Sequence, residues 1–264
     1  MSARRESGMA LVMAATVAAV IAGVVAALLW QRGAWLTDER RGAEHALADA
    51  ASLAGLGWAR RALAGEKERS AKTLEHVSTT LGSPAVSLSV RLEDAQSRFN
   101  LNSAADEQGL AALRRLLTGL ALPGGLAETI RAGAPWADER DLRHLGTPAP
   151  AGLESLLQRV IALPADAALN VNTASPEVLA AVIPGLPQTD AAALAERARR
   201  APFPNVEAFT QALPAGIDAS TVALAVASQY FRVVSYAQAG MAMAVREALV
   251  DSEGAQAPLP GGGR

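Results

Sequence analysis

The residue types most often used in catalysis do not form a recognisable set in this sequence. The histidines, His45, His76 and His144, are far apart and stand in polar or helical contexts. No serine has a histidine and a carboxylate at the spacing of a known nucleophilic site. Pro123-Gly124-Gly125 is most simply a turn between helices, and the chain has no cysteine for a disulfide or a thiolate metal site. We therefore expect no enzymatic activity.

Acidic residues that could bind a cation follow Trp136. They are Asp138, Glu139 and Asp141. A calcium ion takes six to eight oxygen ligands, usually from several carboxylates, so this set is small for the purpose. Acidic residues at this place before an apolar position are typical of the capped first turn of a helix. We predict no metal site and no cofactor.

The first thirty residues indicate a different kind of chemistry, which is proteolytic processing. Arg4 and Arg5 precede Ser7-Gly8, and the run from Met9 to Trp30 has no charged residue. Such a run is long enough to span a bilayer as a helix, which needs about 20 residues. The small residue stands before the apolar run, whereas a secretory signal has it afterwards. Cleavage after Gly8 would remove the leader 1–8 and make Met9 the first residue.

This arrangement resembles the class III signal of type IV pilins and type II secretion pseudopilins, which a prepilin peptidase cuts after glycine and whose new amine is methylated. An uncut membrane anchor is the alternative. The basic leader places the N-terminus in the cytoplasm, so the rest of the chain lies outside the inner membrane, in the periplasm. The formal net charge is −2, which implies no general attraction to nucleic acid.

The elements around these residues predict an α+β fold. The helical pattern continues without proline over 31–64, where one helix face carries Leu47, Ala50, Ala54, Trp58 and Arg61. Residues 86–92 alternate between apolar and polar, as in a half-buried strand, and 97–102 form a second strand or its stub. Two further strands, 230–236 and 241–246, flank a turn at 238–240. Because a hairpin alone is marginal, the early and late strands should form one antiparallel sheet on the long helix.

The long middle block predicts helices punctuated by proline and glycine. We divide the chain into leader 1–8, transmembrane helix 9–30, a first part of the sheet domain 31–103, a helical insertion 104–225, C-terminal strands 226–251 and a disordered tail 252–264. Within the insertion we expect helices at 106–120, 124–132, 137–145, 151–162, 175–182, 188–200, 205–212 and 218–227. Segments beginning at Trp136 and Phe203 resemble each other at an offset of about 67 residues, which suggests two similar units.

The clearest local motif is the segment 170–179. Ser175 is a good helix N-cap and Pro176 suits the first helical position, while Asn170 and Asn172 can hydrogen-bond the turn that enters the helix. The motif resembles helix–hairpin–helix modules, including those of membrane-anchored competence DNA receptors. However, Pro187 stands where such modules present a glycine N–H to phosphate. We therefore expect no nucleic-acid binding, and a membrane-anchored DNA-binding protein is the alternative function.

Taken over its full length, the sequence resembles the type II secretion system protein K family of minor pseudopilins. The resemblance rests on Gly8 before Met9, on Asp94 followed by Arg98-Phe99-Asn100-Leu101-Asn102, on Asn170-Val171-Asn172-Thr173, and on the terminal Tyr230–Val233 with its hairpin. It implies a pilin-like domain, with a long N-terminal helix on a small sheet, interrupted by an inserted all-α domain that is SAM-like or helix–hairpin–helix-like.

The resemblance also implies a function and partners. Members stand at the tip of the pseudopilus, where they initiate or cap assembly and support protein export across the outer membrane, together with other minor pseudopilins. Most pilins carry glutamate at the fifth mature position, which pairs with the subunit above, and here that position is Met13. Members often bind calcium through an acidic loop that looks shortened in this chain, so the resemblance leaves calcium as the alternative to our prediction of no metal site.

Overall fold

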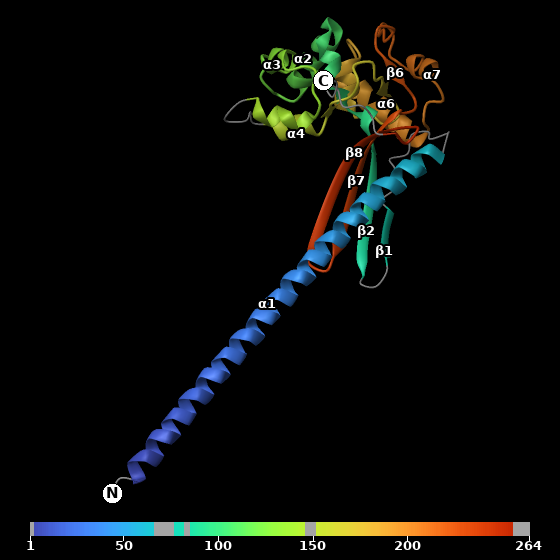
Figure 1. Ribbon diagram of the computed structural model, residues 1–264. Coiled ribbons are helices and arrows are strands. Elements are labelled where there is room, and N and C mark those ends of the chain that lie inside the picture. The colour runs from blue at the N-terminus through green and yellow to red at the C-terminus, as the bar shows by residue number, and fades with distance from the viewer. Residues whose placement is uncertain (1–2, 66–76, 82–84, 146–151, 256–264) are drawn as a thin grey trace.

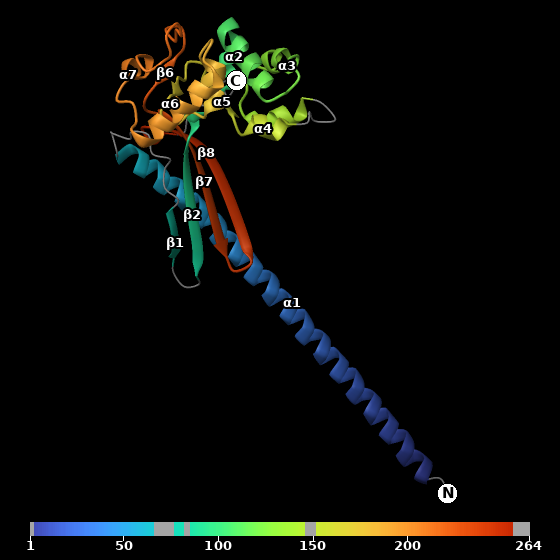
Figure 2. The ribbon, with the colours of Figure 1, turned by 180° about the vertical axis from the view of Figure 1, so that it is seen from behind.

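The computed structural model describes residues 3–65, 77–81, 85–145 and 152–255. One long helix, α1 (Ala3–Gly65), extends far from the rest of the molecule at its N-terminal half and lies along a sheet at its C-terminal half (Figure 1). The remaining helices gather at the end of the sheet that is distant from the N-terminus, as the opposite view also shows (Figure 2). Within the described residues, no helix has a stretch both long and apolar enough to cross a membrane.

The sheet has four antiparallel strands in the order β1-β2-β7-β8. Their bounds are β1 Val77–Leu81, β2 Val86–Asp94, β7 Tyr230–Ala239 and β8 Ala242–Asp251. The expected pairing of early and late strands is confirmed, since β2 pairs with β7 from Val86↔Ala239 to Asp94↔Phe231. The β7–β8 turn is shorter than predicted, because positive φ at Gly240 (57°) closes it within two residues. Strand β1 was not predicted, because its residues are few and mostly polar.

The face of α1 that packs on the sheet differs from the predicted one. The buried row contains small side chains, Ala48, Ser52 and Ala59, followed by Leu63. At Gly55 a Cβ atom would lie 2.2 Å from Ser235 Oγ, so the absence of a side chain lets the helix approach the strands closely. The predicted row, Leu47, Ala50, Ala54, Trp58 and Arg61, is exposed. The helix has two apolar faces, and the sheet takes the smaller side chains.

An insertion separates β2 from β7 in sequence and sits on the end of the sheet (Figures 1 and 2). Its described elements, in chain order, are η1 Ala95–Ser97, β3 Phe99–Asn100, η2 Leu101–Ala105, α2 Glu107–Gly119, α3 Leu126–Ala132, η3 Glu139–His144, α4 Leu153–Leu157, β4 Val160–Ile161, β5 Leu169–Asn170, α5 Pro176–Val182, α6 Gln188–Arg200, α7 Val206–Thr210 and β6 Leu224–Ala225. The prediction of a mixed helix-and-sheet fold is thus confirmed, while the insertion is more than helices alone.

Three predicted helices of the insertion are wrong in part or entirely. Residues 218–227 contain strand β6 in place of a helix, and 151–162 contain the short α4 followed by β4. Residues 137–145 contain the 3₁₀ helix η3. In the first two cases the apolar residues are needed for short parallel pairs, β5 with β6 and β3 with β4. Alternation over two residues is too short to be seen in a sequence pattern.

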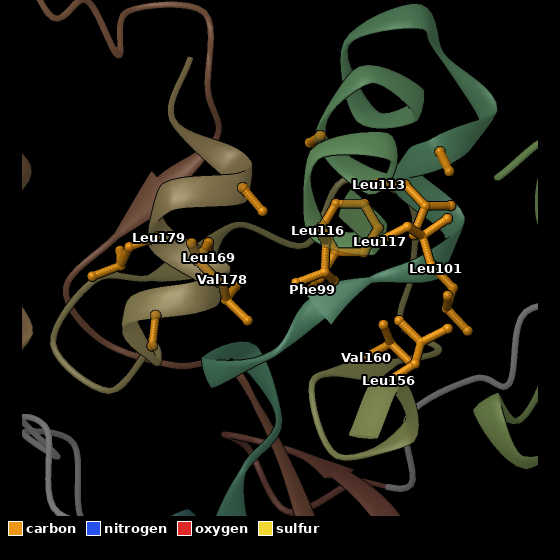
Figure 3. Close-up of a cluster of buried hydrophobic side chains, with 14 of the residues drawn as sticks. Phe99, Leu101, Leu113, Leu116, Leu117, Leu156, Val160, Leu169, Val178 and Leu179 are labelled. Atoms are coloured by element: carbon orange, nitrogen blue, oxygen red, sulfur yellow. The ribbon is translucent and has the colours of Figure 1, made fainter. Parts of the chain in front are cut away.

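The insertion begins earlier than the predicted boundary at residue 104. The last residue of β2 is Asp94, and β3, at Phe99–Asn100, pairs with β4 of the insertion and not with the main sheet. The insertion has its own apolar core, in which leucines of α2 (Leu113, Leu116, Leu117) lie beside Phe99 (Figure 3). Val178 and Leu179 of α5 belong to the same cluster. A separate cluster holds α1 against the sheet through Leu56, Leu88 and Val233. The insertion and the sheet domain therefore have separate hydrophobic cores.

Candidate functional site

The asparagines singled out in the sequence hold together the turns of the insertion. The amide of Asn102 is buried, and its Nδ2 donates to the carbonyl oxygens of Trp136 (2.9 Å) and Leu163 (2.8 Å). Its Oδ1 accepts from the backbone N–H of Trp136 at 2.7 Å. The side chain therefore pairs with both polar backbone groups of one residue, as a strand would.

Asn172 makes the same set of bonds in the second half of the insertion. Its Oδ1 accepts from the N–H of Phe203 at 2.8 Å, and its Nδ2 donates to the carbonyls of Phe203 and Val226, each at 3.0 Å. The preceding asparagines correspond as well, because Asn100 accepts from Asn102 N (3.1 Å) and Asn170 from Asn172 N (3.0 Å).

These bonds confirm that the insertion contains two similar units. In each unit an Asn-x-Asn segment leads into a capped helix, by Asp106 before α2 and by Ser175 before α5. The second asparagine of each segment then binds the backbone of an aromatic residue, Trp136 or Phe203. Each unit also contains one parallel pair of two-residue strands, β3 with β4 in the first unit and β5 with β6 in the second. The two Asn-x-Asn segments lie 70 residues apart in the sequence. That spacing was the signal that would have identified them as equivalent.

Both chain crossings between sheet and insertion meet at Asp94. Its Oδ2 accepts from Asn170 Nδ2 (2.8 Å) and from the hydroxyl of Thr173. Its Oδ1 accepts from Ser228 Oγ (2.5 Å) and from the backbone N–H of Gln96 (2.8 Å). In the sequence Asp94 contributed only to the family resemblance, and this role was missed, because three of its four partners lie more than seventy positions away in the chain.

Gln96 and Arg98 complete this set of contacts between the sheet and the insertion, which we call the joint. Gln96 is buried, donates through Nε2 to the carbonyl of Ala168 (2.5 Å) and accepts at Oε1 from the N–H of Tyr230 (3.1 Å). Arg98 donates to the Glu93 carboxylate at 2.8 Å. The outgoing strand β2 and the returning strand β7 are thus joined to each other and to the second unit.

Ion pairs form a second link between insertion and sheet. Arg232 on β7 pairs with Glu247 (2.9 Å) and with Glu139 of η3, whose side chain is 6% exposed. Arg140 pairs with Glu247 (3.1 Å) and Asp138 (2.8 Å). Burial lowers the pKa of Arg232. Burial acts to raise the pKa of the Asp138 carboxyl, but hydrogen bonds from Arg140 outweigh it, so that the pKa lies below its ordinary value.

Two of the three residues considered for a cation, Asp138 and Glu139, have other partners. Asp138 caps η3 by accepting from Arg140 N, as the sequence predicted for a helix start, and Glu139 faces Arg232. Among the described residues, no cluster of histidine, aspartate and glutamate has the geometry of a metal site. The site as a whole fixes the position of the insertion on the sheet. The predicted processing residues, Gly8 and Met9, lie on α1, far from this joint (Figure 1).

Comparison with known proteins gives two findings. Residues 169–227, which contain the second Asn-x-Asn unit, match the family model described as type II secretion system (T2SS), protein K. No curated protein sequence matches the chain. Among solved structures, the fold is similar to a chain in the crystal structure of the GspK-GspI-GspJ complex from enterotoxigenic Escherichia coli. The TM-score is 0.61 at 21% sequence identity, over 81% of this chain and 92% of the other.

Proposed function

We propose that this chain is a minor pseudopilin of the type II secretion protein K family. We propose further that it stands at the tip of the pseudopilus, where it initiates or caps assembly and supports protein export across the outer membrane. The observation that carries the proposal is the position of the insertion. It occupies the end of the sheet domain that is distant from the N-terminal half of α1 (Figure 1).

The position of the insertion argues for a terminal subunit. Pilin-like subunits stack by packing their long helices side by side, and each new subunit is added from the membrane below. The hydrogen bonds at Asp94 and the ion pairs of Arg232 hold the insertion on the outer end of the sheet. A bulky body fixed there would obstruct any subunit placed above it. The chain can then have neighbours beside and below it, but not above.

The start of the apolar run supports the same location. After cleavage behind Gly8, the fifth mature residue would be Met13, which has no charge to pair with the amine of a subunit above. A subunit at the tip needs no such pair, and an unpaired carboxylate would be costly in the membrane. We propose that a prepilin peptidase cuts between Gly8 and Met9, that the new amine is methylated, and that 9–30 anchors the chain in the inner membrane with the insertion in the periplasm.

The exposed face of α1 offers the surface for other minor pseudopilins. Leu53 is 60% exposed, and Leu47 and Trp58 are 38% and 37% exposed, on the side of the helix that faces away from the sheet. Ala46 and Ala50 lie exposed among them and would let a second helix approach closely. Replacing Ala50 with tryptophan should therefore weaken the complex with other pseudopilins and leave the insertion folded. The solved structure of similar fold is itself a complex of three proteins.

The alternative function, DNA binding by a helix–hairpin–helix module, has less support. The insertion keeps the helical pair α5 and α6, and we propose that it is a SAM-like domain used for its shape. Pro187 stands at the N-cap of α6 without a side-chain cap bond. Arg199 and Arg200 both pair with Glu196, and Arg197 stacks 4.9 Å above the Phe203 ring. Few cations are left on this helix for phosphate.

The proposed location can be tested on assembled pseudopili. The full-length chain, with a gold-binding tag on an exposed loop of the insertion, should be found at one end of each filament. Even labelling along the filaments would contradict the tip position. As a control, the same tag on the major subunit should label the whole length. Intact-mass analysis of the membrane-bound chain should show loss of residues 1–8, and Gly8→Val should prevent it.

A further inference from the structure

Two cavities stand at corresponding places in the insertion, each between the capped helix of one unit and the strand pair of the other. One lies beside the first turn of α5 and is lined by Arg98 and Arg159 of the first unit. The other lies beside the first turns of α2 and is lined by Ala168 and Ala223 of the second unit.

Backbone hydrogen bonds establish that these lining positions are equivalent. The first residue of β3 donates its N–H to the carbonyl of Arg159 (2.8 Å), and the first residue of β5 donates to the carbonyl of Ala223 (2.9 Å). The residues directly before these two strands, Arg98 and Ala168, correspond in the same way. The first unit therefore places two guanidinium groups where the second unit has only two methyl groups.

The cavity beside α2 is consequently roomy and mostly apolar. Its volume is about 260 Å³, whereas one water needs only about 10–15 Å³, so side chains of another segment can enter it. It opens to solvent at Thr221 and Ala223, which are exposed. We call this cavity the α2 groove. Its apolar lining includes Phe99, Ala112, Leu163, Ala168, Val182 and Ala223.

The charged groups that line the α2 groove already have partners. Arg98 donates to the Glu93 carboxylate at 2.8 Å, and Arg115 Nε donates to the carbonyl of Ala181 at 2.7 Å. The carboxylate of Asp106, at the exposed rim, caps α2. An ionic ligand would have to compete with these bonds, whereas an apolar segment would leave them in place. The groove therefore suits an uncharged, apolar stretch of polypeptide.

The last described residue of the chain lies close to the α2 groove. Ala255 accepts from Asp251 N at 2.9 Å, and Asp251 pairs with Tyr230 in the register of the sheet. Tyr230 N donates to Gln96 Oε1 (3.1 Å), while Nε2 of the same amide donates to the carbonyl of Ala168 (2.5 Å). One strand spacing of about 5 Å and hydrogen bonds of about 3 Å each then place Ala255 within about 17 Å of Ala168.

The sequence that follows Ala255 matches the groove in length and composition. Fully extended, residues 256–264 span about 30 Å at roughly 3.3–3.6 Å per residue, which is more than the distance to be covered. The stretch Ala257-Pro258-Leu259-Pro260 is uncharged and apolar. Its prolines have no N–H, so fewer backbone donors would be left unpaired among apolar side chains. The charged residue of the segment, Arg264, is opposite in sign to Asp106 at the rim.

We propose that the α2 groove is a binding site for the chain's own segment 256–264, and that Leu259 is the side chain that enters the cavity. A short connection gives such a segment an effective concentration in the millimolar range, so that a second copy or a foreign peptide would have to compete with it. The docked segment ties the end of β8 to the insertion and adds a third link to the joint and the ion pairs of Arg232. This docking takes place wherever the chain stands in the pseudopilus.

The docking can be tested on the full-length chain in membrane vesicles, because the chain has no cysteine of its own. Gly261→Cys combined with Ala223→Cys should form a disulfide within the chain about tenfold faster than Gly261→Cys combined with Gln211→Cys, since the docked segment raises the effective concentration of the first pair. Gln211 is exposed and lies outside the groove. Equal rates for the two pairs would overturn the proposal. Disulfides formed only between molecules would overturn it as well and would assign the groove to a second copy.

Substitutions on both sides of the contact give a second readout in the same Gly261→Cys, Ala223→Cys chain. Leu259→Asp should slow disulfide formation by about tenfold, as expected for the loss of a buried leucine. Ala168→Arg, which introduces the side chain of the equivalent position in the first unit, should slow it similarly. Asp166→Arg, at an exposed neighbour outside the groove, should leave the rate unchanged.

Helical circular dichroism of each variant shows whether the insertion stays folded. If Ala168→Arg disturbs it, Leu259→Asp decides the question alone. A rate that Leu259→Asp does not lower would contradict the docking of this segment, and the proposed function would be unaffected.

Discussion

At the scale of single residues, the two pairing asparagines make a quantitative prediction. Asn172→Ala would leave the buried N–H and carbonyl of Phe203 without their side-chain partner. Each orphaned buried group costs about 1–3 kcal/mol, so the free energy of unfolding should fall by about 2–6 kcal/mol. Urea denaturation of the purified chain measures the change.

The matched control for this substitution is Gln211→Ala. Its exposed amide makes only a 3.3 Å bond to Glu207, and the expected change lies within about 0.5 kcal/mol. An Asn172→Ala chain with the same denaturation midpoint as the unaltered one would mean that these bonds do not stabilise the second unit.

Glu44 predicts a specific pH dependence. Hydrogen bonds from the backbone N–H of Met241 and from Arg40 hold the pKa of Glu44 below its ordinary value of 4.5. A carboxyl whose folded-state pKa is depressed contributes stability above its unfolded pKa, and the contribution disappears as pH falls through the folded value. Glu44→Gln should therefore flatten the fall in melting temperature between about pH 5 and pH 3. Parallel curves for both proteins would contradict the assignment.

The residue types of the site could be predicted from the sequence, but its bonds could not. Ser175 as an N-cap and the asparagine turns follow from local rules, and the structure confirms them. The bonds of Asn102 to Trp136 and of Asp94 to Ser228 join positions far apart in the chain. Rules based on neighbouring residues cannot predict bonds between residues so far apart in the sequence. Only an alignment of the two repeats on their Asn-x-Asn segments would have shown that Asn102 and Asn172 play the same role.

At the scale of elements, the contact between α1 and the sheet depends on one glycine. A Cβ on Gly55 would lie 2.2 Å from Ser235 Oγ and 3.0 Å from side-chain atoms of Leu88 and Val90. Gly55→Ala should lower the free energy of unfolding by about 1–3 kcal/mol, the usual range for overpacking. The helix would have to move away from the strands.

Gly57→Ala on the same helix is the control. There the nearest atom to an added Cβ is an Arg61 side-chain nitrogen at 3.6 Å, an ordinary contact. The higher helix propensity of alanine should then stabilise the chain, by up to about 1 kcal/mol. Chemical denaturation of the pair compares the two changes directly. A stabilising Gly55→Ala would show that the close approach is not needed.

Element types were predicted best where the pattern was long. Alternation over 86–92 was enough to identify β2, and the capped helix α5 begins and ends where expected. The core face of α1 was assigned to the wrong side, because several residues that the sheet buries are small (Ala48, Ser52, Gly55 and Ala59), whereas the predicted row contains Leu47 and Trp58. Apolar size alone does not distinguish a core face from a face that awaits a partner.

At the scale of the whole molecule, the boundaries of the insertion make a prediction about folding. A fragment 104–225 lacks Phe99 and Asn102, which pair with β4 and Trp136, and it lacks Val226, whose carbonyl binds Asn172. A fragment 95–229 keeps all three. We expect 95–229 to unfold cooperatively with helical circular dichroism, and 104–225 to show a broad, weak transition. Equal cooperativity of the two would contradict these boundaries.

The division of the chain into a sheet domain and an insertion could be predicted, because strand patterns stand only at its two ends. The position of the boundary could not. Arg98–Asn102 has the composition of a strand, and nothing in the sequence tells whether Phe99 pairs with the main sheet or with Val160. That choice is made by packing between segments some sixty residues apart.

The meeting of Asp94 with Ser228 also bears on how such a molecule could arise. The chain leaves the sheet and re-enters it at one point, and Asp94 lies opposite Phe231 in the register of β2 and β7. Everything between these two residues could be cut out and replaced by a tight turn, and the remainder would still be an uninterrupted antiparallel hairpin. The helix and the sheet could therefore stand as a complete domain without the insertion, and the place where the insertion joins them is the place where it could be gained or lost without breaking a strand.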